Sequence, residues 1–222
     1  MNKAINPAFS RVGSACGAVF AVVLFVANGD GSQPFSGPRA VAGLAALTLA
    51  IPFFGYLVTV LREAVLREAR AAGAGGWLTA TALGSGITWA ALKLGSGAPE
   101  LAMVKTHVAA GSELHAAIGG IADGATVISL FPLAVCCAAI AVLAFRSRAL
   151  PRWLAVGAGI TAVALVVNGA ILQTASVPAM LLFVLWTLLA SGYLTIQAWR
   201  TPAAAQPVPA QSVDAAETAM RG

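Results

Sequence analysis

The sequence predicts an all-α polytopic membrane protein with six transmembrane helices and both termini in the cytoplasm. Three observations predict this fold. Hydrophobic residues make up 59% of the 222 residues and charged residues only 9%, whereas soluble chains carry about 25% charged residues. Six almost uncharged runs approach the length of about 20 residues that spans a hydrocarbon core about 30 Å thick. Basic residues are concentrated in alternate connections between these runs.

The composition also excludes several classes of protein. Because so few side chains are charged, lipid must face most of the surface, and an ordinary soluble domain or a disordered chain is excluded. All three cysteines fall inside predicted spans, which excludes a disulfide-rich secreted scaffold. The net charge of +5 reflects topology, because no basic cluster lies on a soluble face. We therefore expect the lipid bilayer as a partner and no nucleic acid.

The predicted spans form one transmembrane domain over residues 1–200. They cover residues 12–28, 40–61, 77–94, 124–145, 153–172 and 177–199. The first span follows basic residues as a signal peptide does, but Phe25 is too large for the small-residue pattern at a cleavage site, so we expect the span to remain. Residues 201–222 contain prolines among Ala, Gln and Ser and are expected to form a disordered cytoplasmic tail.

Basic residues orient the predicted bundle, because Lys and Arg are retained on the cytoplasmic side of short loops. With a cytoplasmic N-terminus, ten of the 13 basic residues lie on the inner side and three on the outer side. The inner residues are Lys3, Arg11, Arg62, Arg67, Arg70, Arg146, Arg148, Arg152, Arg200 and Arg221, and the outer ones are Arg39, Lys93 and Lys105. This asymmetry places the protein in a cytoplasmic membrane with both termini inside.

The inner loop between the fourth and fifth spans is a tight cationic turn. It contains Arg146, Arg148 and Arg152, and Pro151 suits the first turn of the following helix. We interpret the three arginines as a positive-inside anchor, which every polytopic protein needs. The alternative is that they bind an anionic lipid headgroup.

The outer connection from Gly95 to Asp123 is too polar to span lipid and holds both histidines of the protein. Pro99 is suited to open one short helix that Gly111 ends, and Ser112 to cap a second one. Asp123 is placed to cap the fourth span by accepting from backbone N–H groups of its first turn. We therefore expect a short helical outer segment between spans three and four.

Candidate metal ligands in this segment are His107, Glu113 and His115, because imidazole and carboxylate groups bind zinc. The histidines are eight positions apart, which separates them by about 80° on one continuous helix, and no HExxH spacing is present. An outer-face metal site therefore rests on residue type alone. The alternative is an amphipathic cap over the outer mouth of the bundle.

Two prolines lie near the middles of predicted spans, Pro52 in the second and Pro132 in the fourth. Each lacks a backbone donor, and Pro52 thereby frees the carbonyl of Thr48. Kinks at these prolines, with Ser129 and Asn168 nearby, would open a cavity for a small apolar ligand. The alternative is that neighbouring helices absorb the defects and that Asn168 makes an interhelical hydrogen bond.

The rest of the sequence contains no motif that indicates catalysis, ion coupling or cofactor binding. No carboxylate lies at the centre of a predicted span, which counts against an ion-coupled pump. No nucleotide-binding loop, serine nucleophile elbow or pair of haem-ligand histidines in opposing spans is present, so no cofactor is expected. Three pairs of small residues four positions apart allow close helix approach: Gly13 and Gly17, Ala80 and Gly84, and Ala155 and Gly159.

Three stretches carry a resemblance to a known family. They are Asp123-Gly-Ala-Thr, Leu130-Phe-Pro-Leu, and Arg146-Ser-Arg-Ala-Leu-Pro-Arg-Trp-Leu entering the fifth span. Residues 9–199 with this pattern resemble an uncharacterised family of bacterial membrane proteins, domain-of-unknown-function family 4386. The resemblance implies a bacterial cytoplasmic-membrane protein of six helices, and it supplies no catalytic residue.

Three functions of different classes fit the sequence. The first is a non-enzymatic membrane protein that binds or passes a small apolar or lipid-like ligand through a cavity near Pro52, Pro132 and Asn168. The second is a structural or regulatory protein that engages another membrane protein or a second copy of itself. The third is an outer-face metal-dependent enzyme that uses His107, Glu113 and His115. An enzyme is the less favoured of these interpretations.

Overall fold

The computed structural model describes residues 7–28, 37–68, 76–106, 109, 111–172 and 177–200. These residues form six α-helices and one π-helical segment, and none of them lies in a β-strand. The elements are α1 (Pro7–Asn28), α2 (Gly37–Glu68), α3 (Gly76–Thr106), α4 (Glu113–Ser147), α5 (Arg152–Val167), η1 (Asn168–Leu172) and α6 (Val177–Arg200). The predicted all-α class is confirmed. The predicted tail, residues 201–222, lies outside the described residues.

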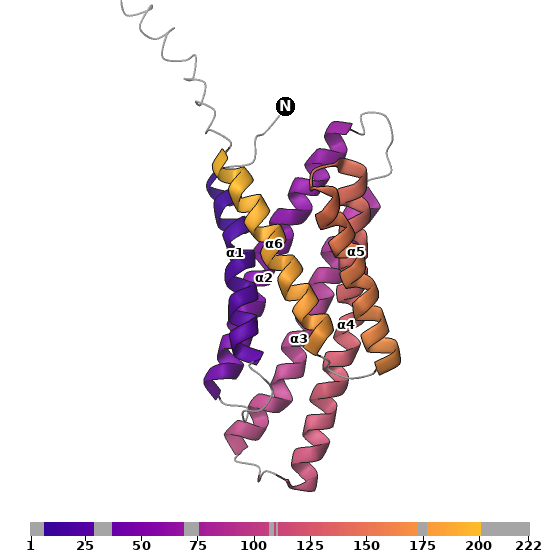
Figure 1. The fold of residues 1–222 in the computed structure, drawn as a ribbon. Helices are drawn as coiled ribbons and strands as arrows, with labels where there is room; N and C mark the ends of the chain where they lie inside the picture. Colours follow the sequence, from indigo (N-terminus) through magenta and orange to yellow (C-terminus); the bar gives the residue numbers. More distant parts are fainter. Residues whose placement is uncertain are drawn as a thin grey trace, which may run out of the picture.

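The six helices form a bundle that closes in chain order. Each helix contacts the next, α6 returns to contact α1, and α2 also contacts α4 across the bundle. Successive helices run in opposite directions (Figure 1). Because their number is even, the start of α1 and the end of α6 lie at the same end of the bundle.

Apolar side chains lie on the outside of the bundle as well as inside it. Phe25, Ile160 and Leu185, on three different helices, have exposed fractions of 56%, 56% and 52%. Four described helical stretches are long and apolar enough to cross a membrane: Ala45–Glu63, Glu113–Ser147, Arg152–Leu172 and Pro178–Arg200. An apolar surface this extensive is stable against lipid tails rather than water. The helices are those of an integral membrane protein.

The predicted spans at residues 12–28 and 77–94 fall in α1 and α3, which are not among these four stretches. In α1 the described apolar stretch is the shorter Arg11–Val26. In α3 the predicted span contains Gly, Ser and Thr residues together with Lys93, which lower its hydropathy. These two helices therefore differ from the other four in the length or the hydropathy of their apolar stretch.

The connection predicted to lie on the outer side, residues 95–123, is largely helical, but it is not a separate segment as predicted. Instead α3 continues through Pro99 to Thr106, and α4 begins at Glu113. At 1.5 Å per residue, the 35 residues of α4 extend about 52 Å, well beyond a hydrocarbon core of about 30 Å. Figure 1 shows this α3–α4 hairpin extending past the ends of the other helices. The prediction that Pro99 opens a new helix is wrong, because packing against α4 outweighs the one backbone hydrogen bond that proline cannot donate.

Ser112 caps α4 as predicted, whereas Asp123 does not cap a helix. The Ser112 hydroxyl accepts a hydrogen bond from the backbone N–H of His115 at 3.1 Å. Gly111 precedes it with φ of +82°, a left-handed conformation that glycine adopts without a steric penalty. Asp123 lies exposed inside α4, ten residues beyond its first residue, Glu113. Backbone N–H groups there already bond within the helix, so the predicted capping role of Asp123 is wrong.

Lys93 joins the two helices of the hairpin. Its ammonium group donates to the hydroxyl of Thr126 on α4 at 3.0 Å, and the Lys93 side chain is half-buried. The contact with the Thr126 hydroxyl satisfies part of the hydrogen-bonding capacity of Lys93 in an apolar setting. The expectation that the Lys93 stem reaches the membrane interface stays a prediction.

The α4–α5 turn is closed by a residue in a strained conformation. Arg148 follows the last residue of α4 with φ of 49° and ψ of 16°, and its N–H donates to the carbonyl of Ala144 at 3.1 Å. Glycine or asparagine usually fills this left-handed position at a helix C-terminus. The turn then leads through Pro151 into α5.

Replacing Arg148 by glycine is expected to stabilise the protein by about 1 kcal/mol, because the left-handed conformation costs a residue with a β-carbon roughly this amount. The measurement is equilibrium unfolding in mixed detergent micelles. As a control, Arg146→Gly lies in the last turn of α4, where glycine is expected to cost about 1 kcal/mol. Equal effects of the two substitutions would contradict the role assigned to the turn.

Candidate functional site

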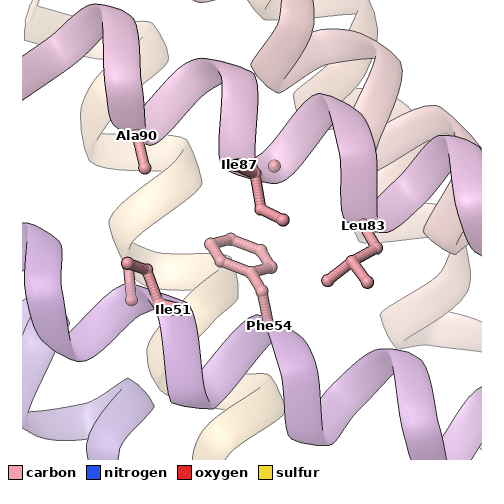
Figure 2. Close-up of a pocket in the computed structure, with 7 residues that line it drawn as sticks. Ile51, Phe54, Leu83, Ile87 and Ala90 are labelled. Atoms are coloured by element: carbon pink, nitrogen blue, oxygen red, sulfur yellow. The ribbon is translucent and has the colours of Figure 1, made fainter.

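A groove between α2 and α3 is the candidate functional site (Figure 2). Its open volume is about 250 Å³. The lining residues are all apolar: Ala50, Ile51 and Phe54 from α2, and Leu83, Gly86, Ile87 and Ala90 from α3. A groove with this lining offers dispersion contacts and no hydrogen bond from a side chain, so it suits hydrocarbon.

Small residues create the groove, and larger ones form its rim. Ala50, Gly86 and Ala90 leave room between the two helices. Ile51 and Ile87 stand at the rim with exposed fractions of 51% and 53%. Because the rim residues belong to the apolar outer surface of the bundle, the groove opens on the side that faces lipid.

Phe54 forms the back wall of the groove and is also part of the interior. Its ring fills the space between α2 and α3 (Figure 2), yet only 4% of the residue is exposed. Towards the interior it meets two rings from other helices, Trp89 at a centroid distance of 6.1 Å and Phe183 at 6.3 Å. Both of these rings also contact Phe20 of α1. We call these four residues, Phe20, Phe54, Trp89 and Phe183, the aromatic cluster.

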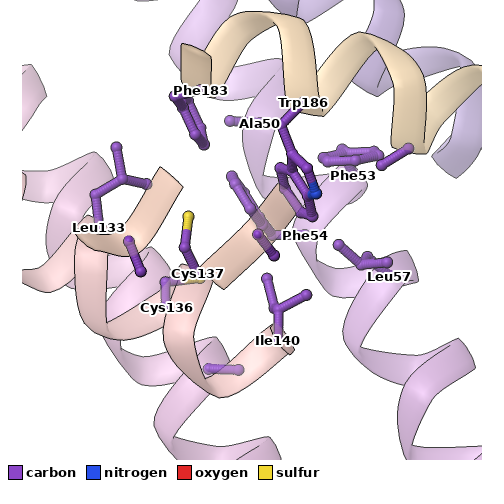
Figure 3. Packing of buried hydrophobic residues seen from close by; sticks show 14 of the residues in the cluster. Ala50, Phe53, Phe54, Leu57, Leu133, Cys136, Cys137, Ile140, Phe183 and Trp186 are labelled. Atoms are coloured by element: carbon purple, nitrogen blue, oxygen red, sulfur yellow. The ribbon is translucent and has the colours of Figure 1, made fainter. Parts of the chain in front are cut away.

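The aromatic cluster joins four helices near the centre of the bundle. Trp89 lies edge-on to Phe20 at 6.1 Å and to Phe183 at 5.6 Å. Edge-to-face contacts of this kind add roughly 0.5–1.5 kcal/mol per pair beyond the area they bury. Figure 3 shows Phe54 and Phe183 among buried side chains that include Cys136 and Cys137 of α4, both free thiols. Both cysteine side chains are fully buried and pack in the interior of the bundle.

Two buried tryptophans differ in their hydrogen bonding. The indole N–H of Trp186 donates to the carbonyl of Leu154 at 3.0 Å and ties α6 to α5. The indole N–H of Trp89 has no acceptor among the described residues, although only 1% of Trp89 is exposed. Leaving a buried donor unpaired costs about 1–3 kcal/mol. Among the described residues, the Trp89 N–H is thus a buried donor without an acceptor, and the Trp89 ring lies 6.1 Å from the Phe54 ring that lines the groove.

The residues predicted to line a cavity do not line this groove. Thr48 is exposed on α2, where its hydroxyl donates to the carbonyl of Ala45 at 2.7 Å. Pro52 is half-buried and lies between two lining residues, Ile51 and Phe54. The groove therefore lies beside the predicted kink in α2.

The other three predicted cavity residues lie together elsewhere. Ser129 and Pro132 flank Leu130 and Phe131 of α4, which lie against Gly169 of η1, the residue that follows Asn168. Asn168 is 2% exposed, and the Ser129 hydroxyl donates within α4 to the carbonyl of Thr126 at 2.7 Å. None of these three residues lines the groove between α2 and α3, and their role in ligand binding stays a prediction.

One feature of the sequence indicates the groove, although the cavity was predicted from the prolines and not from this feature. Gly86 and Ala90 are small residues one helical turn apart, and Ala50 is their counterpart on α2. Such a pair usually allows two helices to approach closely. Here the large Phe54 side chain lies between the two helices (Figure 2).

The predicted metal ligands are only partly described. His107 lies outside the described residues, Glu113 is exposed, and His115 is half-buried at the start of α4. Among the described residues, no group of three His, Cys, Asp or Glu side chains is arranged to hold a metal ion. The three-residue metal site stays a prediction.

The three arginines of the α4–α5 turn are exposed. Arg146, Arg148 and Arg152 follow one another around the turn. In the same half of the bundle, the guanidinium carbon of Arg11 lies 4.6 Å from the centre of the Trp199 ring, a cation–π contact between α1 and α6. A lipid-headgroup site at the turn stays a prediction.

Comparison with known proteins gives no relative: no family model, no curated protein and no solved structure matches this chain. The resemblance to the bacterial membrane family stays a prediction. The role of the groove therefore has to follow from its own geometry and chemistry.

Proposed function

We propose that this chain is a six-span integral protein of the bacterial cytoplasmic membrane, with both termini in the cytoplasm, that binds the apolar chain of a lipid-like molecule between α2 and α3. The observation that carries the proposal is the groove, which has only apolar residues in its lining and opens on the lipid-facing surface. No catalytic role is needed for this function.

The six-span topology is supported by the order and direction of the helices. All six helices lie in one bundle and alternate in direction, so α1 and α3 lie alongside the four most apolar stretches. The arginines of the α4–α5 turn lie at the end of the bundle where α1 begins and α6 ends. Cytoplasmic retention of arginine would place that end inside.

The size of the groove limits what can bind. The open volume of about 250 Å³ includes space that is continuous with the surroundings of the bundle, so the groove is shallow and encloses little volume of its own. It offers an apolar face to a short stretch of hydrocarbon chain and does not enclose a whole lipid. The rest of the ligand would stay in the bilayer, so binding needs no aqueous entry path.

Filling the groove is expected to abolish ligand retention. Ile87→Trp adds a large ring at the rim, and we expect at least a tenfold loss of copurified apolar molecules, measured by native mass spectrometry of the gently extracted protein. Ile128→Trp is the matched control, because Ile128 is 58% exposed on α4 and does not line the groove.

Three outcomes of this experiment are distinguishable. Loss of the bound molecule in Ile87→Trp but not in Ile128→Trp supports the groove as its site. Equal retention in both variants contradicts it. A retained protein in place of a small molecule would favour the structural or regulatory function instead.

A further inference from the structure

We propose that the ligand site continues inward past the Phe54 ring to Trp89, whose indole N–H donates a hydrogen bond to a carbonyl oxygen carried within an apolar ligand. This inference deepens the proposed function and rests on it, because the ligand enters from the groove. It identifies the chemical class of the ligand as a neutral long-chain or ring carbonyl compound. It also assigns Phe54 as the gate of the site and Trp89 as the hydrogen-bond donor.

The gate follows from the position of Phe54. One side of this ring forms the back wall of the groove, and the other side lies 6.1 Å from Trp89 and 6.3 Å from Phe183, measured between ring centroids. Gly86 and Ala90 flank Trp89 on α3 and present little side chain to the groove. In the proposed site, rotation of the Phe54 side chain opens the groove towards Trp89.

The donor follows from the unmet hydrogen bond of Trp89. Buried tryptophan N–H groups usually have an acceptor, and Trp186 of the same bundle has one in the carbonyl of Leu154. The Trp89 N–H has none among the described residues. The surrounding rings of Phe20, Phe54 and Phe183 offer at most weak N–H···π contacts. An acceptor oxygen supplied by a ligand would satisfy this donor.

The depth of Trp89 identifies the class of ligand. Trp77, 63% exposed at the start of α3, suits the inner interface, and Trp89 lies twelve residues further along the helix. This is about 18 Å at 1.5 Å per residue, more than half of a hydrocarbon core about 30 Å thick. The polar headgroup regions of bilayer lipids lie outside that core, so a carbonyl that reaches Trp89 must lie within the apolar body of the ligand.

The test compares two probes that differ only in the acceptor. The full chain in phosphatidylcholine nanodiscs is titrated with a long symmetrical ketone, isotope-labelled at its carbonyl, and with the alkane of the same length. Infrared spectroscopy of the bound ketone is expected to show its C=O stretch shifted to lower frequency than in protein-free nanodiscs. Native mass spectrometry is expected to show tighter binding of the ketone than of the alkane by roughly fivefold, the effect of one neutral hydrogen bond.

Two variants separate the Trp89 donor from a general effect of tryptophan loss. In Trp89→Phe the frequency shift and the fivefold preference for the ketone are expected to disappear, while alkane binding is kept. Trp186→Phe is the matched control, because its N–H already has an acceptor inside the protein; there the shift and the preference are expected to remain.

The C=O frequency and the binding of the two probes test the inference and the proposed function separately. An unshifted C=O stretch of ketone bound to the unsubstituted protein overturns the inference even if no variant folds. Equal binding of both probes, blocked by Ile87→Trp, also overturns it but leaves the proposed function intact. Failure of both probes to bind, or binding that Ile87→Trp does not affect, overturns the proposed function and the inference together.

Discussion

Replacing Gly13 by alanine is expected to destabilise the bundle by about 1–3 kcal/mol, the usual cost of inserting a methyl group into a well-packed interior. A β-carbon at Gly13 would lie 2.6 Å from the β-carbon of Tyr56 on α2. Because that atom is bonded directly to the α2 backbone, it cannot move aside without moving the helix. One turn along α1, a β-carbon at Gly17 would lie 2.3 Å from the Phe53 ring. The two glycines thus set the distance between α1 and α2.

The measurement is equilibrium unfolding of the purified protein by sodium dodecyl sulfate in mixed micelles. Gly84→Ala is the matched control, because Gly84 lies in α3 and a β-carbon there meets no atom within 4 Å. This control is expected to be neutral or to stabilise by up to about 1 kcal/mol, since alanine favours a helix over glycine. A destabilisation of the same size in both variants would show that the α1–α2 contact is not the cause.

Close helix approach could be predicted from the sequence, but not which small residues provide it. The pairs Gly13 and Gly17, and Ala80 and Gly84, have the same spacing. The first pair packs against α2, whereas Ala80 and Gly84 are exposed on the outside of α3. Spacing places two residues on one face of a helix, but only the arrangement of neighbouring helices decides whether that face is covered.

The long hairpin could be predicted only in part for a related reason. Hydropathy separates residues 95–123 from the apolar runs of the sequence, whereas the apolar helical stretch of α4 in the structure begins at Glu113. Hydropathy does not mark where a helix ends, because a helix that leaves the membrane keeps its backbone hydrogen bonds. Capping chemistry located the true start of α4 at Ser112, since a serine hydroxyl is a helix N-cap on either side of an interface. Asp123 has similar chemistry but lies inside the helix.

The candidate groove was the least predictable feature. Proline positions predicted a cavity near Pro52, and the groove lies beside it, but its shape depends on Phe54 and three small residues from two helices. The unmet N–H of Trp89 has no signal in the sequence, because Trp186 is the same residue type, is also buried in a helix, and does have an acceptor. Whether a buried indole N–H has an acceptor depends on residues that are distant in the sequence, as Leu154 is from Trp186.

Replacing Phe183 by alanine is expected to destabilise the protein by about 3 kcal/mol, the lower end of the range for deleting a buried phenylalanine. Phe183 is fully buried, and its ring contacts those of Phe20, Phe54 and Trp89. In a membrane the surrounding lipid is as apolar as the side chain, so little of this cost is hydrophobic transfer. The cost arises because the side chains around the empty space no longer have dispersion partners on that side.

The empty space gives the prediction a second measurement. An apolar cavity of this kind stays dry and binds small aromatic molecules, so benzene is expected to raise the unfolding midpoint of Phe183→Ala but not that of the unsubstituted protein. Leu185→Ala is the matched control, because Leu185 is two residues away on α6 and 52% exposed to the lipid side. There the expected loss is below about 1 kcal/mol, since lipid tails fill the space that the side chain leaves. If Phe183→Ala lost no more stability than Leu185→Ala, the aromatic cluster would not be the centre that holds the four helices together.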